Sequence, residues 1–339
     1  MRRLPVYLVI DCSESMAGEA IQAVEEGIAK MISQLRSDPF ALETVWLSVI
    51  TFSYHAKIHV RLSDITTFVM PPFVLASGTA FGAAIALVHE RIKTEVVKST
   101  PERKGDWKPV VFFLTDGNPT DQWQANADKF KREYSNGGAN VTAVACGEDA
   151  STSNLRRLTD KVILAQDLDS STVKGLFAWV SASISSGSMA LDRSKDVSLD
   201  KTEGVAIATT IDDARSIDLD RQVFLQSKCL KNGSHYVMRF RRQLGSADER
   251  YQAIASHAVA NFDDTAAKDS AGLRVSTANL LGSSPCPVCK NPLWAMCRCG
   301  RVHCCPAFGS EGINLTCPWC KKSDHYNILQ HFDVGRGFG

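Results

Sequence analysis

The sequence predicts an α/β protein, with a doubly wound, mostly parallel sheet at its N-terminal end, then a β-rich segment and a small cysteine-rich module. Three observations lead to this prediction. Runs of consecutive apolar residues alternate with segments of helical periodicity over roughly the first 185 residues. Further along, apolar and polar residues alternate around a hairpin turn, which indicates β-structure. Eight of the 11 cysteines then cluster between Cys286 and Cys320.

The first region contains the strands and helices of a sheet that is covered on both faces. Apolar residues recur at helical spacing from Ile21 to Leu35 and from Ile85 to Ile92, so these helices can cover the sheet. Lys57–Val60 follows the preceding apolar run too closely for a crossover, which predicts an antiparallel edge strand. The strands predicted to be buried on both faces are Val6–Ile10, Val45–Phe52, Val110–Thr115, Val141–Cys146 and Val162–Ala165.

The middle of the chain differs from the first region. A helix that ends near Ile184 runs into Ser185-Ser186-Gly187-Ser188, which indicates a domain boundary. Asn232-Gly233 predicts a hairpin turn between the strands Gln222–Leu230 and His235–Arg241. From Tyr251 to Gly282, alanine-rich stretches fit a strand and a helix equally well. The predicted divisions are 1–185 for the α/β domain, 186–282 for a linker and β-rich segment, 283–325 for a zinc-binding module and 326–339 for a tail.

Composition narrows the possible functions. The 339 residues include 38 basic and 37 acidic side chains, so the net charge of +1 provides no general attraction for nucleic acid or membrane. No apolar run approaches the roughly 18–20 residues that span a bilayer, and Asp11 interrupts the apolar stretch near the start before a signal peptide could form. Clustered cysteines indicate metal binding in a reducing compartment, and we therefore expect a cytoplasmic protein.

Oxygen-bearing side chains lie in three loops that follow predicted strands. Asp11, Ser13 and Ser15 come directly after the first strand, Asp116 directly follows the strand that ends at Thr115, and Thr79 lies in a loop before a helix. In open α/β sheets, ligands bind outside the carboxyl ends of the strands, where such loops meet. Carboxylate and hydroxyl oxygens suit a hard divalent ion such as magnesium. The same residue types are also common helix caps, which is the competing interpretation.

The charges of these ligands predict an adhesion role. Hydroxyl ligands are neutral, so one directly bound carboxylate, with a second acting through water, would leave the ion positively charged and with an open position. An acidic residue of another protein could complete the coordination. For this role we expect Asp11 and Asp116 to lie at a solvent-open edge of the sheet.

These residues resemble those of a known family. Asp11-x-Ser13-x-Ser15, Thr79 and Thr115-Asp116-Gly117 are similar to the metal-ion-dependent adhesion site of von Willebrand factor A domains. Glu14 stands where that pattern commonly has glycine, and its charge would weaken attraction for an acidic partner. Four further segments resemble the TerY-like subfamily associated with tellurite resistance: Pro5–Leu8, Asp38–Leu42, Gly105–Pro109 and Trp179–Ser183.

The resemblance implies a magnesium-binding protein-interaction domain in a bacterial stress-response or signalling system. Members of the subfamily are often encoded beside a protein kinase and a metal-dependent phosphatase, which are therefore the implied partners. A cysteine-rich metal-binding region follows the A domain in that family, and the C-terminal cysteine cluster of this chain resembles it.

The cysteine cluster predicts structural zinc. Paired cysteines at close spacing can hold a tetrahedral zinc ion, and eight thiolates would fill two sites with no open position. The order of the pairs resembles a cross-brace, in which the first and third pairs share one ion and the second and fourth share the other. His303 with Cys305 could replace Cys304 in the third pair, and a disulfide network is the alternative to metal. The candidate zinc ligands are Cys286, Cys289, Cys297, Cys299, Cys304, Cys305, Cys317 and Cys320, with His303 as the alternative.

Three classes of function compete on this basis: a non-enzymatic metal-dependent scaffold, a phosphotransfer enzyme and a nucleic-acid-binding zinc protein. A phosphatase of the haloacid dehalogenase type would need an acid two residues after Asp11, where Ser13 stands, so we predict no catalytic residues. Residues 283–325 carry five basic and two acidic side chains, a modest excess for nucleic-acid binding. We therefore favour the scaffold.

Overall fold

The computed structural model describes ten stretches of the chain. They are residues 2–115, 119–134, 137–147, 150–165, 170–189, 205–207, 222–243, 249–263, 274–327 and 331–336. The chain forms two compact units: the first contains 1–12, 19–73 and 79–218, and the second contains 13–18, 74–78 and 219–339. Most of the predicted linker after residue 189 lies outside the described residues.

A seven-stranded sheet forms the centre of the first unit, in the order β3-β2-β1-β4-β5-β6-β7. Neighbouring strands from β2 to β6 are parallel, whereas β3 and β7 are antiparallel edge strands. The five predicted buried strands are confirmed, and Lys57–Val60 lies within the predicted edge strand. The bounds are Leu4–Asp11 (β1), Val45–Phe52 (β2), Ala56–Asp64 (β3), Val110–Thr115 (β4), Asn140–Cys146 (β5), Val162–Ala165 (β6) and Val205–Ile207 (β7).

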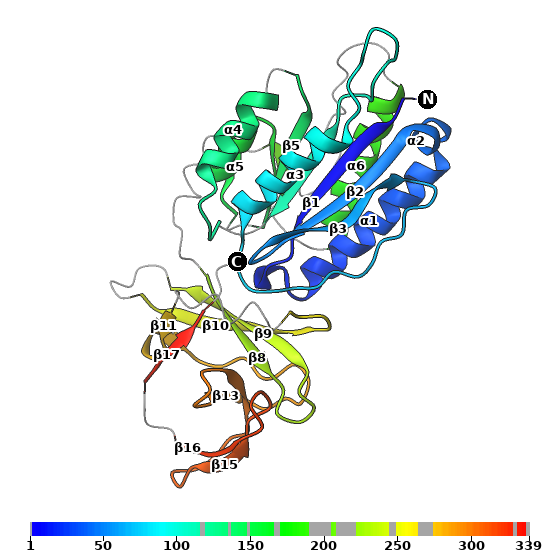
Figure 1. Ribbon diagram of the computed structural model, residues 1–339. Coiled ribbons are helices and arrows are strands. Elements are labelled where there is room, and N and C mark those ends of the chain that lie inside the picture. Colours follow the sequence, from blue (N-terminus) through cyan, green and yellow to red (C-terminus); the bar gives the residue numbers. More distant parts are fainter. Residues whose placement is uncertain are drawn as a thin grey trace. The chain divides into compact units, whose positions relative to one another are not determined.

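Helices cover both faces of this sheet (Figure 1). On one face, Val111 and Phe113 of β4 pack with Phe81 of α3, Phe130 of α4 and Leu155 of α5. The sheet is therefore doubly wound, as the sequence predicts. The helices are α1 (Glu19–Ser37), α2 (Pro39–Thr44), α3 (Phe81–Glu95), α4 (Gln124–Tyr134), α5 (Thr152–Leu158) and α6 (Ser170–Met189). The 3-10 helix η1 (Glu14–Met16) belongs to the second unit.

The opposite face packs against α1 and α6. Phe112, between the two β4 residues that face α3, contacts Trp179 of α6 with ring centroids 5.9 Å apart. This is the alternation expected of a strand with both faces buried. A Cβ atom at Gly27 of α1 would collide with the ring of Phe177 in α6, so the two helices approach closely only because residue 27 has no side chain.

A six-stranded sheet forms the centre of the second unit, in the order β12-β10-β9-β8-β14-β13. The predicted hairpin is confirmed: β8 and β9 pair in antiparallel fashion around Gly233, whose φ is 76°. The sequence from Tyr251 to Gly282 fits a strand and a helix equally well, and the structure has a strand, β10, at its start. The bounds are Gln222–Lys228 (β8), His235–Arg242 (β9), Tyr251–Val259 (β10), Leu280–Leu281 (β12), Leu293–Met296 (β13) and Val302–Cys305 (β14).

The β-rich segment and the cysteine-rich module share this sheet. Strand β14 pairs in parallel with β8. The predicted division at residue 282, which places these two strands in different parts of the chain, therefore cuts through one sheet. The predicted tail also takes part, because β17 (Asp333–Gly335) pairs with β11 (Arg274–Ser276), which leads into the 3-10 helix η3 (Thr277–Asn279). A further hairpin joins β15 (Ile313–Thr316) to β16 (Ser323–Tyr326). Within the described stretches, no helix is both long and apolar enough to cross a bilayer.

Candidate metal centres

The first candidate centre starts at the carboxyl end of β1. Asp11 is the last residue of this strand, and its Oδ2 accepts a hydrogen bond of 2.6 Å from the hydroxyl of Thr115, the last residue of β4. The parallel pairing of β1 with β4 brings the two strand ends together. Asp116, the second predicted acid, lies outside the described residues.

The burial of Asp11 differs from the expectation. The carboxylate is predicted to lie at a solvent-open edge of the sheet, but the exposed fraction of Asp11 is 0 %. The reason is its position on an inner strand: β1 lies between β2 and β4, and the next residue, Cys12, continues the contact by donating its N–H to the carbonyl of Phe52. A buried carboxylate is costly without compensation, and the Thr115 hydroxyl supplies one partner.

The hydroxyl residues of the predicted site are held by local hydrogen bonds. Ser13 and Ser15 bond to each other through their hydroxyls at 2.8 Å, and Ser13 is fully buried. Thr79 is also fully buried, and its N–H donates to the hydroxyl of Thr120 at 3.0 Å. Ser13 precedes η1 without a side-chain capping bond, and the residue that precedes α3 is Ala80 rather than Thr79. The helix-cap interpretation therefore does not hold for Ser13 or Thr79.

The carboxylate of Glu14, which stands where the family pattern commonly has glycine, is buried and hydrogen-bonded. The Glu14 side chain is only 2 % exposed, and Oε2 accepts the N–H of Gly78 at 2.8 Å. Gly78 has a φ of 92°, a left-handed conformation that favours glycine. The backbone of the loop that contains Ser77 and Thr79 therefore turns at Gly78. The carboxylate thus ties residues 13–18 to residues 74–78, both of which belong to the second unit.

Eight cysteines form two groups in the second unit. In each group, all four sulfurs lie within 4.8 Å of one another. The first group, called the inner group here, consists of Cys229, Cys286, Cys289 and Cys304. The second group, called the outer group, consists of Cys297, Cys299, Cys317 and Cys320.

The grouping agrees with the cross-brace expectation in part. The outer group combines the second and fourth cysteine pairs, as expected. In the inner group, the first pair meets Cys304 together with Cys229, so the adjacent Cys305 is in neither group. Cys304 and Cys305 are consecutive residues of β14, and successive side chains of a strand point to opposite faces. Burial raises the pKa of Cys305 to about 11.

His303, the alternative ligand, is also outside both groups. Its Nε2 lies 3.0 Å from the hydroxyl of Tyr326, and its Nδ1 lies 2.9 Å from the carbonyl of Cys304. The side chain is fully buried, and this burial lowers the pKa of His303. The ring therefore supports β14 from within the core.

Cys229 is not among the predicted zinc ligands, although a hydrogen-bonded turn that it shares with two other cysteines marks it locally. At three cysteines, the N–H four residues further on donates back to the cysteine carbonyl: Gly233 to Cys229 at 2.8 Å, Lys290 to Cys286 at 3.0 Å and Lys321 to Cys317 at 3.0 Å. The residue that closes each turn has a positive φ. A cysteine four residues before Gly233 in the Asn-Gly turn therefore marks the same kind of knuckle.

The separation of the sulfurs fits a tetrahedral ion. Metal–sulfur bonds of about 2.3 Å require sulfur–sulfur separations of about 3.8 Å. The sulfurs of Cys289 and Cys304 are 3.5 Å apart in the inner group. In the outer group, Cys297 lies 3.7 Å from Cys320, and Cys299 lies 3.9 Å from Cys317. Both groups therefore have the donors and spacing that zinc requires.

Burial raises the pKa of Cys317 and Cys304, and amide hydrogen bonds to the sulfurs act against it. Trp319 donates its N–H to the sulfur of Cys317 at 3.4 Å. The backbone N–H of Lys322 lowers the pKa of Cys320 to about 7. In the inner group, the side-chain amide of Asn291 donates to the sulfur of Cys304 at 3.4 Å. Hydrogen bonds of this kind orient metal ligands and tune their basicity.

Comparison with solved structures gives distant likenesses to part of the chain. Proximal thread matrix protein 1 from the mussel byssus is 16% identical over 54% of this chain and 48% of its own, with a TM-score of 0.39. The pilus adhesin SpaC from Lactobacillus rhamnosus GG is 15% identical over 55% of this chain and 31% of its own, with a TM-score of 0.44. BatB from Bacteroides thetaiotaomicron is 15% identical over 55% of this chain and 100% of its own, with a TM-score of 0.39.

The chain thus spans about half the length of the mussel protein and about a third of the pilus adhesin. No curated protein matches the chain in sequence.

Family models match the two parts of the chain separately. The von Willebrand factor type A domain matches residues 6–174, which include most of β1 and strands β2 to β6. The TerY-C metal binding domain matches residues 220–339, which include all eight cysteines of the inner and outer groups. Domains of these two kinds generally serve interaction and metal binding. The chain is therefore a von Willebrand factor A domain protein of the TerY-like family, with a cysteine-rich metal-binding domain at its C-terminal end.

Proposed function

We propose that this protein is a non-enzymatic scaffold that binds another protein through a magnesium ion. The observation that supports this most strongly is the meeting of the Asp11 carboxylate and the Thr115 hydroxyl at the carboxyl ends of the neighbouring parallel strands β1 and β4. In open α/β sheets, ligands bind outside these strand ends. The residues proposed to hold the ion are Asp11, Ser13, Ser15, Thr79 and Asp116.

The ligands from this chain would leave the ion with a net positive charge, which attracts an acidic group of a partner. Asp11 is the proposed direct carboxylate ligand, and the hydroxyls of Ser13, Ser15 and Thr79 add no charge. The bound ion supplies a positively charged position that a carboxylate of the partner can fill. Glu14 does not compete for that position, because its Oε2 accepts the N–H of Gly78.

The two cysteine groups have a different proposed role. Each offers four thiolates at tetrahedral spacing, so we assign one zinc ion to each group, with no open position for a substrate. Zinc there would hold the hairpins of the second unit together. This makes the metal-binding domain a structural platform rather than a catalytic one.

The family match supports a setting for the scaffold. TerY-like proteins are associated with tellurite resistance, so we place this protein in a bacterial stress-response system in the cytoplasm. The proposed partners are a protein kinase, a metal-dependent phosphatase or both, each offering an acidic residue to the magnesium ion. Ser13 occupies the position where a phosphatase of the haloacid dehalogenase type has its second acid, which favours a scaffold over an enzyme.

Affinity capture tests the proposal. The zinc-loaded chain is immobilised and exposed to lysate of its source bacterium, either with magnesium or in buffer without divalent ions, and the zinc content is measured after each wash. We expect a kinase or phosphatase to be retained by the wild type in magnesium alone and to be lost with Asp11→Ala. Asp160→Ala is the matched control, because the Asp160 side chain is 83 % exposed and pairs only at the surface with Lys131.

Retention of the same protein by Asp11→Ala would contradict the adhesion site. Retention without magnesium would show instead that the partner contacts the chain in another way.

A further inference from the structure

The two cysteine groups differ in how far their sulfurs are shielded from water. In the inner group, Cys229, Cys286 and Cys304 are at most 1 % exposed and Cys289 is half-buried. In the outer group, Cys297 and Cys317 are also buried and Cys320 is half-buried, but Cys299 is exposed. The groups have the same four donors, so accessibility rather than ligand type distinguishes them.

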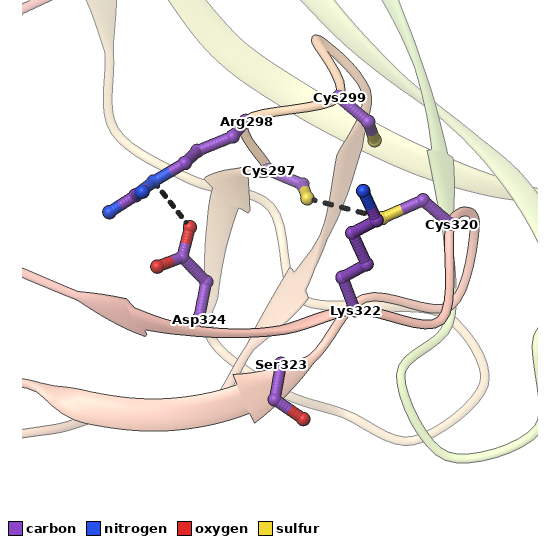
Figure 2. A pocket seen from close by; sticks show the side chains of 7 residues that line it. All are labelled: Cys297, Arg298, Cys299, Cys320, Lys322, Ser323 and Asp324. Carbon is purple, nitrogen blue, oxygen red and sulfur yellow. Dashed lines mark hydrogen bonds and ion pairs between the residues drawn. The ribbon is translucent and has the colours of Figure 1, made fainter.

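A cavity opens directly onto the outer group (Figure 2). Its volume is about 360 Å³, and Cys297, Cys299 and Cys320 form part of its wall. A small dissolved reagent can therefore reach Cys299 and Cys320, whereas Cys297 is only 3 % exposed.

The rest of the wall is polar. Arg298 and Asp324 form an ion pair of 2.8 Å on one side, and Lys322 lies beside Cys320. Arg298 is 87 % exposed, so the mouth of the cavity is in open water. A polar wall admits small hydrophilic oxidants, whereas the inner group is packed against the core residues Tyr236 and Val302.

We propose that the outer group is an oxidation site, at which peroxides convert metal-bound thiolates to a disulfide and thereby release the ion, while the inner group keeps its own. The inference rests on the proposed zinc occupancy of both groups. It assigns the outer group a chemical response in addition to its structural role.

The chemistry balances with a peroxide as the only oxidant. One thiolate attacks hydrogen peroxide, takes up one oxygen to become a sulfenic acid, and the departing hydroxide takes a proton to form water. A neighbouring thiolate attacks the sulfenic sulfur, forming the S–S bond and expelling a second hydroxide, which also takes a proton. Two thiolates lose two electrons, the peroxide gains two, and two protons are consumed. The zinc ion loses two of its four ligands and departs.

The strand connections limit which part of the second unit changes when the outer ion is released. Cys297 and Cys299 lie in the turn between β13 and β14, and Cys317 and Cys320 lie in the turn between β15 and β16. Release of the outer ion frees these two turns from each other. The inner group still joins Cys229, next to β8, to Cys304 of β14, so the six-stranded sheet persists.

Peroxide titration of the full chain tests the proposal. The zinc content is first measured without oxidant, and about two ions per chain are expected. Fewer than two would contradict the zinc assignment itself, independently of the oxidation site. Hydrogen peroxide is then added, and zinc release is followed with a chromophoric zinc indicator. We expect one ion to leave on the order of tenfold faster than the other, because the exposed thiolates react first.

Mass spectrometry after differential alkylation identifies the reacting cysteines. In the wild type, the cysteines oxidised during the fast phase should resist alkylation, and we expect these to be among Cys297, Cys299, Cys317 and Cys320. The inner cysteines should still be alkylated after denaturation. Release of both ions at one rate, or oxidation of the inner group first, would overturn the proposal.

Two matched variants add a second test. Cys299→His and Cys289→His each replace the more accessible thiolate of one group with another zinc ligand. We expect the first substitution to slow the fast phase and the second to leave it unchanged. The reverse pattern would also overturn the proposal.

Discussion

The backbone N–H of Leu230 donates a hydrogen bond of 3.1 Å to the sulfur of Cys304, on a strand far away in the sequence. The register of β8 and β14 explains this contact. His303 pairs with Lys228 in a parallel ladder, so the next residues, Cys304 and Cys229, come together. The inner group is therefore completed by the hairpin that precedes the cysteine cluster.

This geometry predicts opposite effects for two cysteines. Cys229→Ser should reduce the zinc content from about two ions to about one, because a serine hydroxyl is a poor zinc ligand. Cys305→Ser should leave both ions in place, since Cys305 belongs to neither group. Elemental analysis of the purified variants measures the difference. Loss of zinc only in Cys305→Ser would show that β14 presents its other cysteine to the metal.

The contrast between Cys229 and the other ligands shows what the sequence can predict. The strands of the first unit carry runs of consecutive apolar residues, a local pattern, and their prediction is confirmed. The clustered cysteines likewise reveal metal binding by spacing alone. The Asn-Gly turn after Cys229 marks a knuckle, but only the pairing of β14 with β8, a non-local contact, shows which other cysteines Cys229 joins. The burial of Asp11 is missed for the same reason, because it depends on which strands flank β1.

Some of the motifs that suggested the family prove to be structural. Asp38 caps α2 by accepting the N–H groups of Phe40 and Ala41. Asp106 accepts two hydrogen bonds from the guanidinium of Arg3, at 3.0 and 2.6 Å, and a third from the N–H of Val97. These segments therefore identify the domain through its fold, and the proposed adhesion site involves other residues.

The ion pair of Arg3 and Asp106 predicts a measurable loss of stability. The side chain of Asp106 is 6 % exposed and that of Arg3 is 26 % exposed, so solvent screens the pair only in part. Asp106→Asn should lower the free energy of unfolding by about 1.5–3 kcal/mol, the usual worth of hydrogen bonds to charged groups. Chemical denaturation of the two proteins measures this. Asp128→Asn is the matched control, because its ion pair with Arg157 is largely exposed and should contribute much less.

The same pair predicts a dependence on pH. Burial raises the pKa of Asp106, but the hydrogen bonds from Arg3 and Val97 outweigh it, so the pKa of this carboxyl lies below its usual value. A lowered pKa in the folded state stabilises the protein above the unfolded pKa of about 3.9, and this contribution disappears as pH falls through the folded pKa. The difference between wild type and Asp106→Asn should therefore be constant above about pH 5 and shrink below about pH 4. An unchanged difference at pH 3 would contradict the ion pair.

Zinc removal should separate the two units. Structural zinc sites contribute on the order of 10 kcal/mol to folding, so a chelator should unfold the second unit. The first unit has its own core, in which Phe81, Phe113 and Phe130 pack together, and should stay folded. Limited proteolysis with and without chelator tests this by following a protected fragment that ends near residue 218, the end of the first unit. Digestion of both units at the same rate would show that the first unit depends on zinc.

Magnesium should stabilise the first unit through Asp11. Without a divalent ion, the carboxylate of Asp11 is buried with the Thr115 hydroxyl as a donor, and Asp11→Ala should change the melting temperature little or raise it, because a buried charge is removed. With magnesium at 100 times its dissociation constant, binding to the folded state adds about 2.7 kcal/mol. A domain of about 150–250 residues then melts roughly 5–10 °C higher. Differential scanning fluorimetry should show this rise in the wild type and in Asp160→Ala but not in Asp11→Ala, and an equal rise in all three proteins would place the magnesium ion elsewhere.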